Sequence, residues 1–221
     1  DLRTSRGLGD VYKRQIGGSA NFTSHGVEGW HPNPEFYYKN GGGPLFDMGP
    51  YYLTALVKAL GPVHEVTGYS KKTFDKRNVE NPEVNYKEIN VDVDTHYFGL
   101  LKFKSGIIVD FQVTFDIWKP YDPKLEIYGD KSSLKLADPN NYDGEIFIFD
   151  KDLYQWELIY SSTDSQNNFY RGLGVVNMVK AIKNNTVSED ELSVPFHILE
   201  VMCSLDSYNL DSGWKKIIQQ F

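Results

Sequence analysis

The chain has 221 residues, of which 40% are hydrophobic and 24% charged, as is usual for a soluble globular protein. Its formal charge is −7 and it has no cluster of lysine and arginine, which argues against a nucleic acid partner. No apolar run approaches the roughly 20 residues that cross a bilayer, so no membrane partner is expected.

The single cysteine, Cys203, cannot form an internal disulfide and falls in an apolar helical pattern. We expect a small buried side chain in a protein of a reducing compartment, and hence a cytoplasmic location. Aromatic residues are plentiful, with 15 Tyr, 13 Phe and 4 Trp. Two explanations stay open, β-rich structure and a carbohydrate-like ligand that stacks on the rings.

The first fifteen residues, DLRTSRGLGDVYKRQ, show neither helical nor strand periodicity. The piece DVYKRQ resembles a translated sequencing adapter, so residues 1–15 are expected to be an assembly scar outside the fold. A natural basic tail is the alternative. The domain that carries the fold is expected to span 16–221.

The segment 16–23 (IGGSANFT) is predicted as a short strand, and 24–40 as a loop rich in turn formers and aromatic residues. This loop leads directly into three glycines, Gly41 to Gly43. Its side chains can therefore reach whatever follows the glycines.

The stretch 41–61 (GGGPLFDMGPYYLTALVKALG) predicts a buried helix, with apolar residues at helical spacing, Pro44 near its start and Gly61 at its end. Asp47 and Tyr51 are four residues apart and so project from one face. Pro50 cannot donate to the carbonyl of Phe46, which favours a bend between them. An acid beside a phenol behind a glycine-rich segment is the best site candidate in the chain.

Strand-like runs follow the helix at 64–74, 97–104, 107–118, 124–129, 132–137, 145–150 and 154–160, whereas 75–92 is polar and irregular. Short polar connections at 104–106 and 129–131 predict hairpins, and hence an antiparallel sheet. In the run 107–118, Val109, Phe111 and Val113 alternate with Asp110 and Gln112. We expect one face of the sheet to be packed and the other to be solvated or to meet a second copy.

Two helices are predicted near the C-terminus. Residues 168–185 place Val175, Met178, Val179 and Ile182 on one stripe, and residues 195–210 do the same with Ile198, Val201, Met202 and Leu205. The predicted fold class is α+β, a mainly antiparallel β-sheet with helices packed on one face.

The stretch 41–63, preceded by WHPNPEFYYKN and followed by YRGLGVVNMVKAIKNN and HILEVM, resembles the C-terminal domain of the Gfo/Idh/MocA oxidoreductases. The resemblance covers the chain from Ile16 to about Leu210. It implies an NAD- or NADP-dependent dehydrogenase of a sugar, inositol or related polyol, and a homo-oligomer formed through the sheet face.

Two departures from the family pattern stand out. The chain contains no strand followed by G-x-G-x-x-G and a helix, so the Rossmann domain that would bind most of the cofactor is missing, together with the Glu-Lys-Pro motif and its catalytic lysine. Many members carry Asp-x-x-x-His in the central motif, whereas this chain has Asp47 and then Tyr51. Some relatives use tyrosine there, so the departure changes the subgroup. We expect the domain to be inactive alone.

Oxidation of an alcohol by hydride transfer requires that the hydroxyl proton leave as well. The resemblance makes Tyr51 the proton-exchanging group when a cation favours the phenolate, and makes Asp47 the acceptor of a substrate hydroxyl. By spacing alone, Tyr51 packing under the sheet and Asp47 capping local backbone would be favoured.

The expected substrate contacts come from the loop and from the start of the first C-terminal helix: Trp30, His31, Phe36, Tyr37, Tyr38 and Arg171. Gly42 and Gly43 are expected at the cofactor. Each has a structural alternative: the aromatic residues pin the loop to the helix, His31 and His25 are solvated, and Arg171 forms a surface ion pair. No histidine has the spacing of a metal ligand set, so no metal is expected.

Two alternatives stay open beside the dehydrogenase. The domain is complete as a non-catalytic binding or dimerisation module, or it belongs to the NAD-dependent glycosidases that some relatives are. The coding sequence before Ile16 separates the first from a dehydrogenase half, and the products formed from glycosides separate the second.

Overall fold

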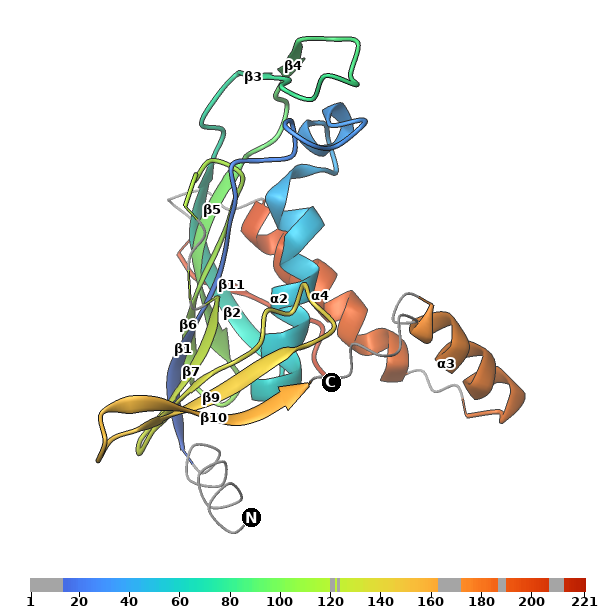
Figure 1. Ribbon diagram of the computed structural model, residues 1–221. Helices are drawn as coiled ribbons and strands as arrows, with labels where there is room; N and C mark the ends of the chain where they lie inside the picture. Colours follow the sequence, from blue (N-terminus) through green and yellow to red (C-terminus); the bar gives the residue numbers. More distant parts are fainter. Residues whose placement is uncertain (1–13, 120–121, 123, 163–171, 187–189, 207–212) are drawn as a thin grey trace.

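The computed structural model describes residues 14–119, 122, 124–162, 172–186, 190–206 and 213–221. They form an α+β fold in which helices cover one face of a nine-stranded sheet (Figure 1). The sheet has the order β10-β9-β8-β7-β1-β6-β5-β2-β11. Its strands are β1 (Gln15–Thr23), β2 (Val63–Lys71), β5 (His96–Phe103), β6 (Ile108–Thr114), β7 (Leu125–Gly129), β8 (Ser133–Lys135), β9 (Gly144–Asp150), β10 (Gln155–Ser162) and β11 (Lys215–Lys216).

Neighbouring strands are antiparallel except for β1 and β6, which run parallel. The predicted hairpin at 104–106 joins β5 to β6, where Gly106 has a φ of +90° and donates its N–H to the carbonyl of Phe103. The hairpin at 129–131 joins β7 to β8. The predicted fold class is confirmed. The parallel pair was not predicted, because the sequence signals report only connections between adjacent strands.

The helical elements are η1 (Glu35–Tyr38), α2 (Gly43–Leu60), α3 (Leu173–Lys183) and α4 (Asp190–Asp206). Helices α2 and α4 lie side by side on the sheet and bury the predicted apolar stripes, including Leu45, Leu56 and Val201. A Cβ at Gly49 would lie 3.4 Å from the sulfur of Met202, so this side of α2 packs against α4. Helix α2 continues through Pro50. No helix in the described parts of the chain is long and apolar enough to cross a membrane.

A small lobe extends beyond the N-terminal end of α2 (Figure 1). It contains the loop 24–40 and the strands β3 (Lys76–Asn78) and β4 (Glu88–Asn90), and it has its own core of Val27, Tyr38, Val79, Val84, Ile89, Val91 and Phe115. The segment 75–92 was predicted to be polar and irregular, but it contributes two short strands and several buried apolar residues. Its apolar residues are isolated among polar neighbours, and they are buried only because the loop 24–40 covers them.

A buried ion-pair network holds this lobe together. The guanidinium of Arg77 on β3 pairs with Glu28 in the loop and, at 2.9 Å, with Asp116 after β6. It also donates to the carbonyls of His25 and Phe115. The three charged side chains are 4–7% exposed, so each is stabilised by its partners and not by water.

Two predictions near the C-terminus were wrong. Cys203 is exposed, because it lies on the side of α4 that faces away from the buried Val201, Met202 and Leu205. The apolar stripe of α3 is exposed as well, and no residue of this helix is buried. Helix α3 projects away from the sheet, so only α2 and α4 form the covering layer (Figure 1).

The face of the sheet opposite α2 and α4 is open, and we refer to it as the open face. Val109, Phe111 and Val113 point to the helices and are at most 1% exposed, so Asp110 and Gln112 point to the open face as predicted. The cross-strand register then adds apolar side chains to it: Tyr69, Phe98, Leu100 and Ile108. Tyr69 and Phe98 are each 49% exposed, which is a large apolar area on a sheet surface.

Candidate active site

The site is built where the loop 24–40 meets the N-terminal end of α2, and the glycines make this contact possible. A Cβ at Gly42 would lie 2.6 Å from the carbonyl oxygen of Tyr37 and 2.7 Å from that of Phe36. Gly43 has a φ of +83°, and a Cβ added there would lie 3.0 Å from the carbonyl oxygen of Asp94. Only glycine allows the loop backbone to lie this close to the start of the helix.

A buried asparagine binds the middle of the loop 24–40. Asn81 is 6% exposed, and its amide donates to the carbonyls of Trp30 and His31, at 3.1 Å each. The Nδ1 of His31 accepts the N–H of Asn33 at 3.0 Å. In the neutral ring the proton is therefore on Nε2, which leaves an N–H donor for a ligand.

Four of the predicted residues are linked by charge or ring contacts: His31, Tyr37, Asp47 and Tyr51. Asp47 and Tyr51 lie one turn apart on α2, the charge of Asp47 interacts with His31, and both Asp47 and Tyr51 act on Tyr37. Burial raises the pKa of the Asp47 carboxyl, and His31 opposes this rise. Burial, together with the charges of Asp47 and Tyr51, raises the pKa of the Tyr37 phenol.

Asp47 and Tyr51 are available to a ligand. Tyr51 is 46% exposed, so it does not pack under the sheet as the structural alternative required. Asp47 is half-buried. The neighbouring Tyr52 is the opposite case, because it is buried and donates to Asp138 at 2.8 Å.

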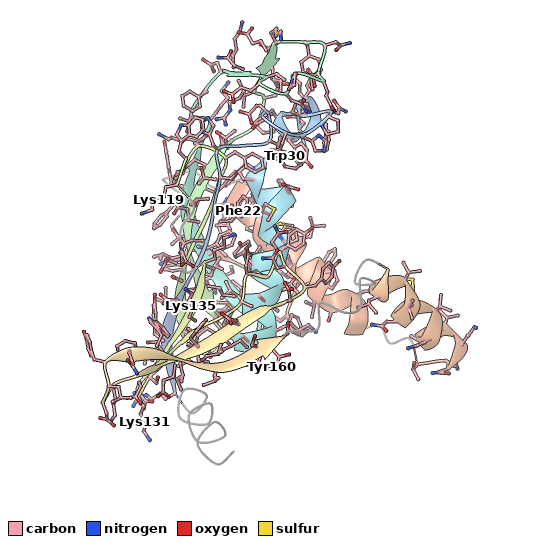
Figure 2. All side chains as sticks on the ribbon, in the orientation of Figure 1. Phe22, Trp30, Lys119, Lys131, Lys135 and Tyr160 are labelled. Carbon is pink, nitrogen blue, oxygen red and sulfur yellow. The ribbon has the colours of Figure 1, made fainter. Side chains whose placement is uncertain are left out.

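The aromatic residues of the loop divide into two groups. Trp30 and Phe36 are 65% and 52% exposed, and both pack edge-on against His31, so they form an open rim. Figure 2 shows Trp30 in the small lobe. Tyr37 packs against the ring of His31. Tyr38 points the other way, into the core of the lobe, where its hydroxyl donates to Glu28. Tyr38 is therefore not available to a substrate, and we leave it out of the site.

Gly42 and Gly43 pack against protein backbone. The cavity beside Gly42 is lined by Lys72 and by three carboxylates, Asp92, Asp94 and Asp206. The contact of Gly42 and Gly43 with a cofactor stays a prediction. Arg171 lies outside the described residues. Within the described parts of the chain, no three His, Cys, Asp or Glu are grouped to hold a metal ion.

Sequence reasoning missed Asn81 and the network of Arg77. The Asn-Pro pair at 81–82 is a turn signal, but it does not show which carbonyls the amide binds. Arg77 and Glu28 are 49 residues apart, and no periodic pattern connects them.

The raised pKa of Asp47 has a consequence for stability. In the pH range between the ordinary value of 3.8 and the raised folded value, the folded state binds more protons than the unfolded state. Stability therefore falls as the pH rises through this range, and the penalty is fully present above it. Urea unfolding should show Asp47→Asn to be more stable than the wild type at pH 7, with a gain that shrinks as the pH is lowered toward 4.

Asp75→Asn is the control, because the pKa of Asp75 is lowered whereas that of Asp47 is raised. Asp75 is exposed, and its hydrogen bond with Lys72 lowers the carboxyl pKa, so this substitution should bring no gain at pH 7. A loss of stability in Asp47→Asn at pH 7 would show that the carboxylate stabilises the fold, and would contradict a functional role.

Comparison with known proteins agrees with this architecture. The family model described as the GFO/IDH/MocA C-terminal domain matches residues 5–135, which is more than half of the chain. A sequence search of curated proteins finds no match.

Among solved structures, levoglucosan dehydrogenase in complex with NADH and levoglucosan is similar, with a TM-score of 0.73 and 13% identity over 99% of this chain. An oxidoreductase domain protein from Kribbella flavida has a TM-score of 0.67 and 19% identity over 98% of the chain. An NAD binding oxidoreductase from Klebsiella pneumoniae has a TM-score of 0.70 and 15% identity over 99%. The chain spans 62–63% of the length of these three proteins, and the similarity concerns the fold. Fold, central helix and family match together show that the chain belongs to the GFO/IDH/MocA family as a C-terminal domain.

Proposed function

We propose that this domain supplies the substrate-binding and proton-transfer groups of an NAD(P)-dependent dehydrogenase that acts on a sugar, inositol or related polyol. The observation that carries the proposal is the convergence of Asp47, Tyr51 and His31 at an open surface. The proposed substrate class is supported by the similar structure of levoglucosan dehydrogenase in complex with NADH and levoglucosan. A cytoplasmic location stays a prediction.

Each group has a defined task in this proposal. The Asp47 carboxylate accepts a hydrogen bond from a substrate hydroxyl, and the Nε2–H of His31 donates to a second oxygen. The exposed rings of Trp30 and Phe36 cover the apolar face of the sugar. Tyr51 exchanges the proton of the hydroxyl that is oxidised.

Tyr51 needs a cation to favour its phenolate, and the lysine of the neighbouring loop does not supply it. Lys39 is bound to Asp92 and to the carbonyl of Asn90, each at 3.0 Å. Another domain would provide this cation and would also bind most of the NAD or NADP. The nicotinamide, when bound, accepts the hydride.

The test requires the chain to be expressed together with the sequence that precedes Ile16 in its gene. We expect reduction of NAD or NADP with a polyol, and no turnover by the domain alone. Tyr51→Phe should lower kcat by about 100-fold or more without an equal change in cofactor binding, because general acid–base groups contribute about 10²–10⁴-fold.

Tyr52→Phe is the matched control. It removes the adjacent phenol, which binds Asp138, and should lower stability but not turnover per folded molecule. Equal turnover of Tyr51→Phe and wild type would overturn the role of Tyr51. The absence of a nucleotide-binding segment before Ile16 would favour a non-catalytic module, and hydrolysis of glycosides would favour an NAD-dependent glycosidase.

We further propose that the open face joins two copies of the chain. Tyr69, Phe98 and Ile108 are 43–49% exposed there, which gives the face an apolar centre. Burial raises the pKa of the Asp110 carboxyl beside them. Contact with a second copy would remove the exposed apolar area from water.

Sedimentation should show a dimer or larger oligomer for the wild type. Phe98→Asp should dissociate it, because a carboxylate would be buried without a partner. The control Leu153→Asp changes a 61% exposed residue at the turn between β9 and β10, and should leave the oligomer intact. A monomeric wild type would contradict the proposal.

A further inference from the structure

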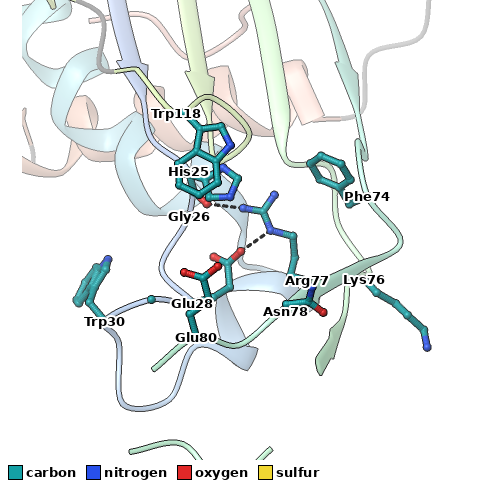
Figure 3. A pocket seen from close by; sticks show the side chains of 11 residues that line it. His25, Gly26, Glu28, Trp30, Phe74, Lys76, Arg77, Asn78, Glu80 and Trp118 are labelled. Carbon is teal, nitrogen blue, oxygen red and sulfur yellow. Dashed lines mark hydrogen bonds and ion pairs between the residues drawn. The ribbon is translucent and has the colours of Figure 1, made fainter. Parts of the chain in front are cut away.

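A second cavity lies in the lobe, and none of the site's reacting groups belongs to it (Figure 3). It has a volume of about 430 Å³, within the range of small-molecule sites. We refer to it as the lobe cavity. The residues used in the argument are His25, Glu28, Trp30, Phe74, Glu80 and Trp118.

The cations that line the lobe cavity are paired with carboxylates of the protein. Arg77 and Glu28 line the cavity, but both are engaged with each other, and Arg77 also donates to Asp116 and to two carbonyls. Lys76 at the edge pairs with Glu88 at 2.7 Å. Both cations of the lining are therefore paired with carboxylates of the protein, so the cavity does not offer a site for an anion.

Three large aromatic side chains line the lobe cavity although they are exposed. Trp118 is 73%, Trp30 65% and Phe74 46% exposed. In Figure 3, Trp30 and Phe74 lie on opposite sides, and Trp118 stacks on His25. Exposed rings around a concave surface favour a ligand with an apolar face, because they are otherwise left in contact with water.

His25 supplies an unsatisfied polar atom. Its Nδ1 is buried and has no hydrogen-bond partner among the residues that the structure describes. The stacked indole of Trp118 covers the imidazole, and the Nδ1 atom is out of reach of solvent. Burial, and then the charge of Arg77, lower the pKa of His25, so the ring is neutral at pH 7. His25 therefore adds no charge to the cavity.

We propose that the lobe cavity binds a neutral polyhydroxylated ring, such as a sugar or cyclitol, as a second site separate from Asp47 and Tyr51. One face of the ring stacks on an indole, and its hydroxyls donate to the carboxylate of Glu80. Trp30 lines this cavity and also packs on His31, so it separates the two sites. The inference does not require that the protein be a dehydrogenase.

Saturation-transfer NMR and tryptophan fluorescence on the whole chain test this site with four probes. They are methyl β-glucopyranoside, myo-inositol, inorganic phosphate and tetramethylammonium chloride. We expect binding of one or both uncharged probes and of neither ion. Trp118→Ala should weaken that binding at least tenfold, and Glu80→Gln should weaken it severalfold.

Two controls locate the effect. Trp214→Ala removes an exposed indole outside the lobe cavity and should leave binding unchanged, whereas Tyr51→Phe reports binding at the candidate active site. Loss of binding in Tyr51→Phe but not in Trp118→Ala would overturn the inference and would place the only sugar site on α2. Failure of both uncharged probes to bind, or binding of an ion that Trp118→Ala abolishes, would overturn it as well.

Discussion

The candidate site depends on the close approach of two pieces of backbone. Gly42 lies against the carbonyls of Phe36 and Tyr37, and a single added methyl group at this position would meet both oxygens at under 3 Å. Because the loop and the start of α2 touch here, His31 and Tyr37 lie beside Asp47. The glycine triplet is thus explained by packing, and its effect on function is to bring the rings of the loop to the carboxylate.

The loop 24–40 is also held by the buried ion pairs of Arg77. Glu28 and Arg77 would each be unstable alone in the lobe, and together with Asp116 they connect the loop, β3 and the end of β6. Asn81 adds two hydrogen bonds to the segment that carries Trp30 and His31. The loop is therefore a rigid support for binding groups, although it has little regular secondary structure.

Local patterns were enough to predict the strands of the large sheet except the two-residue β11. They also predicted the helix of 41–61 and the projection of Asp47 and Tyr51 from one face. The direction of Tyr38 was not predictable, because the adjacent Tyr37 and Tyr38 differ only in their position on the short helix η1. Cys203 and the stripe of α3 were misjudged for a related reason. Periodicity shows which residues share a face, but it does not show what covers that face.

The most direct test of the central claim is the pKa of Asp47, measured by carboxyl ¹³C NMR in the wild type and in His31→Gln. The convergence of loop and helix predicts a value above the ordinary 3.8 in the wild type and a higher one in His31→Gln, because the opposing charge is removed. His64→Gln, on the distant strand β2, should leave the value unchanged. An ordinary pKa for Asp47 that does not respond to His31→Gln would show that the loop and α2 do not form one site.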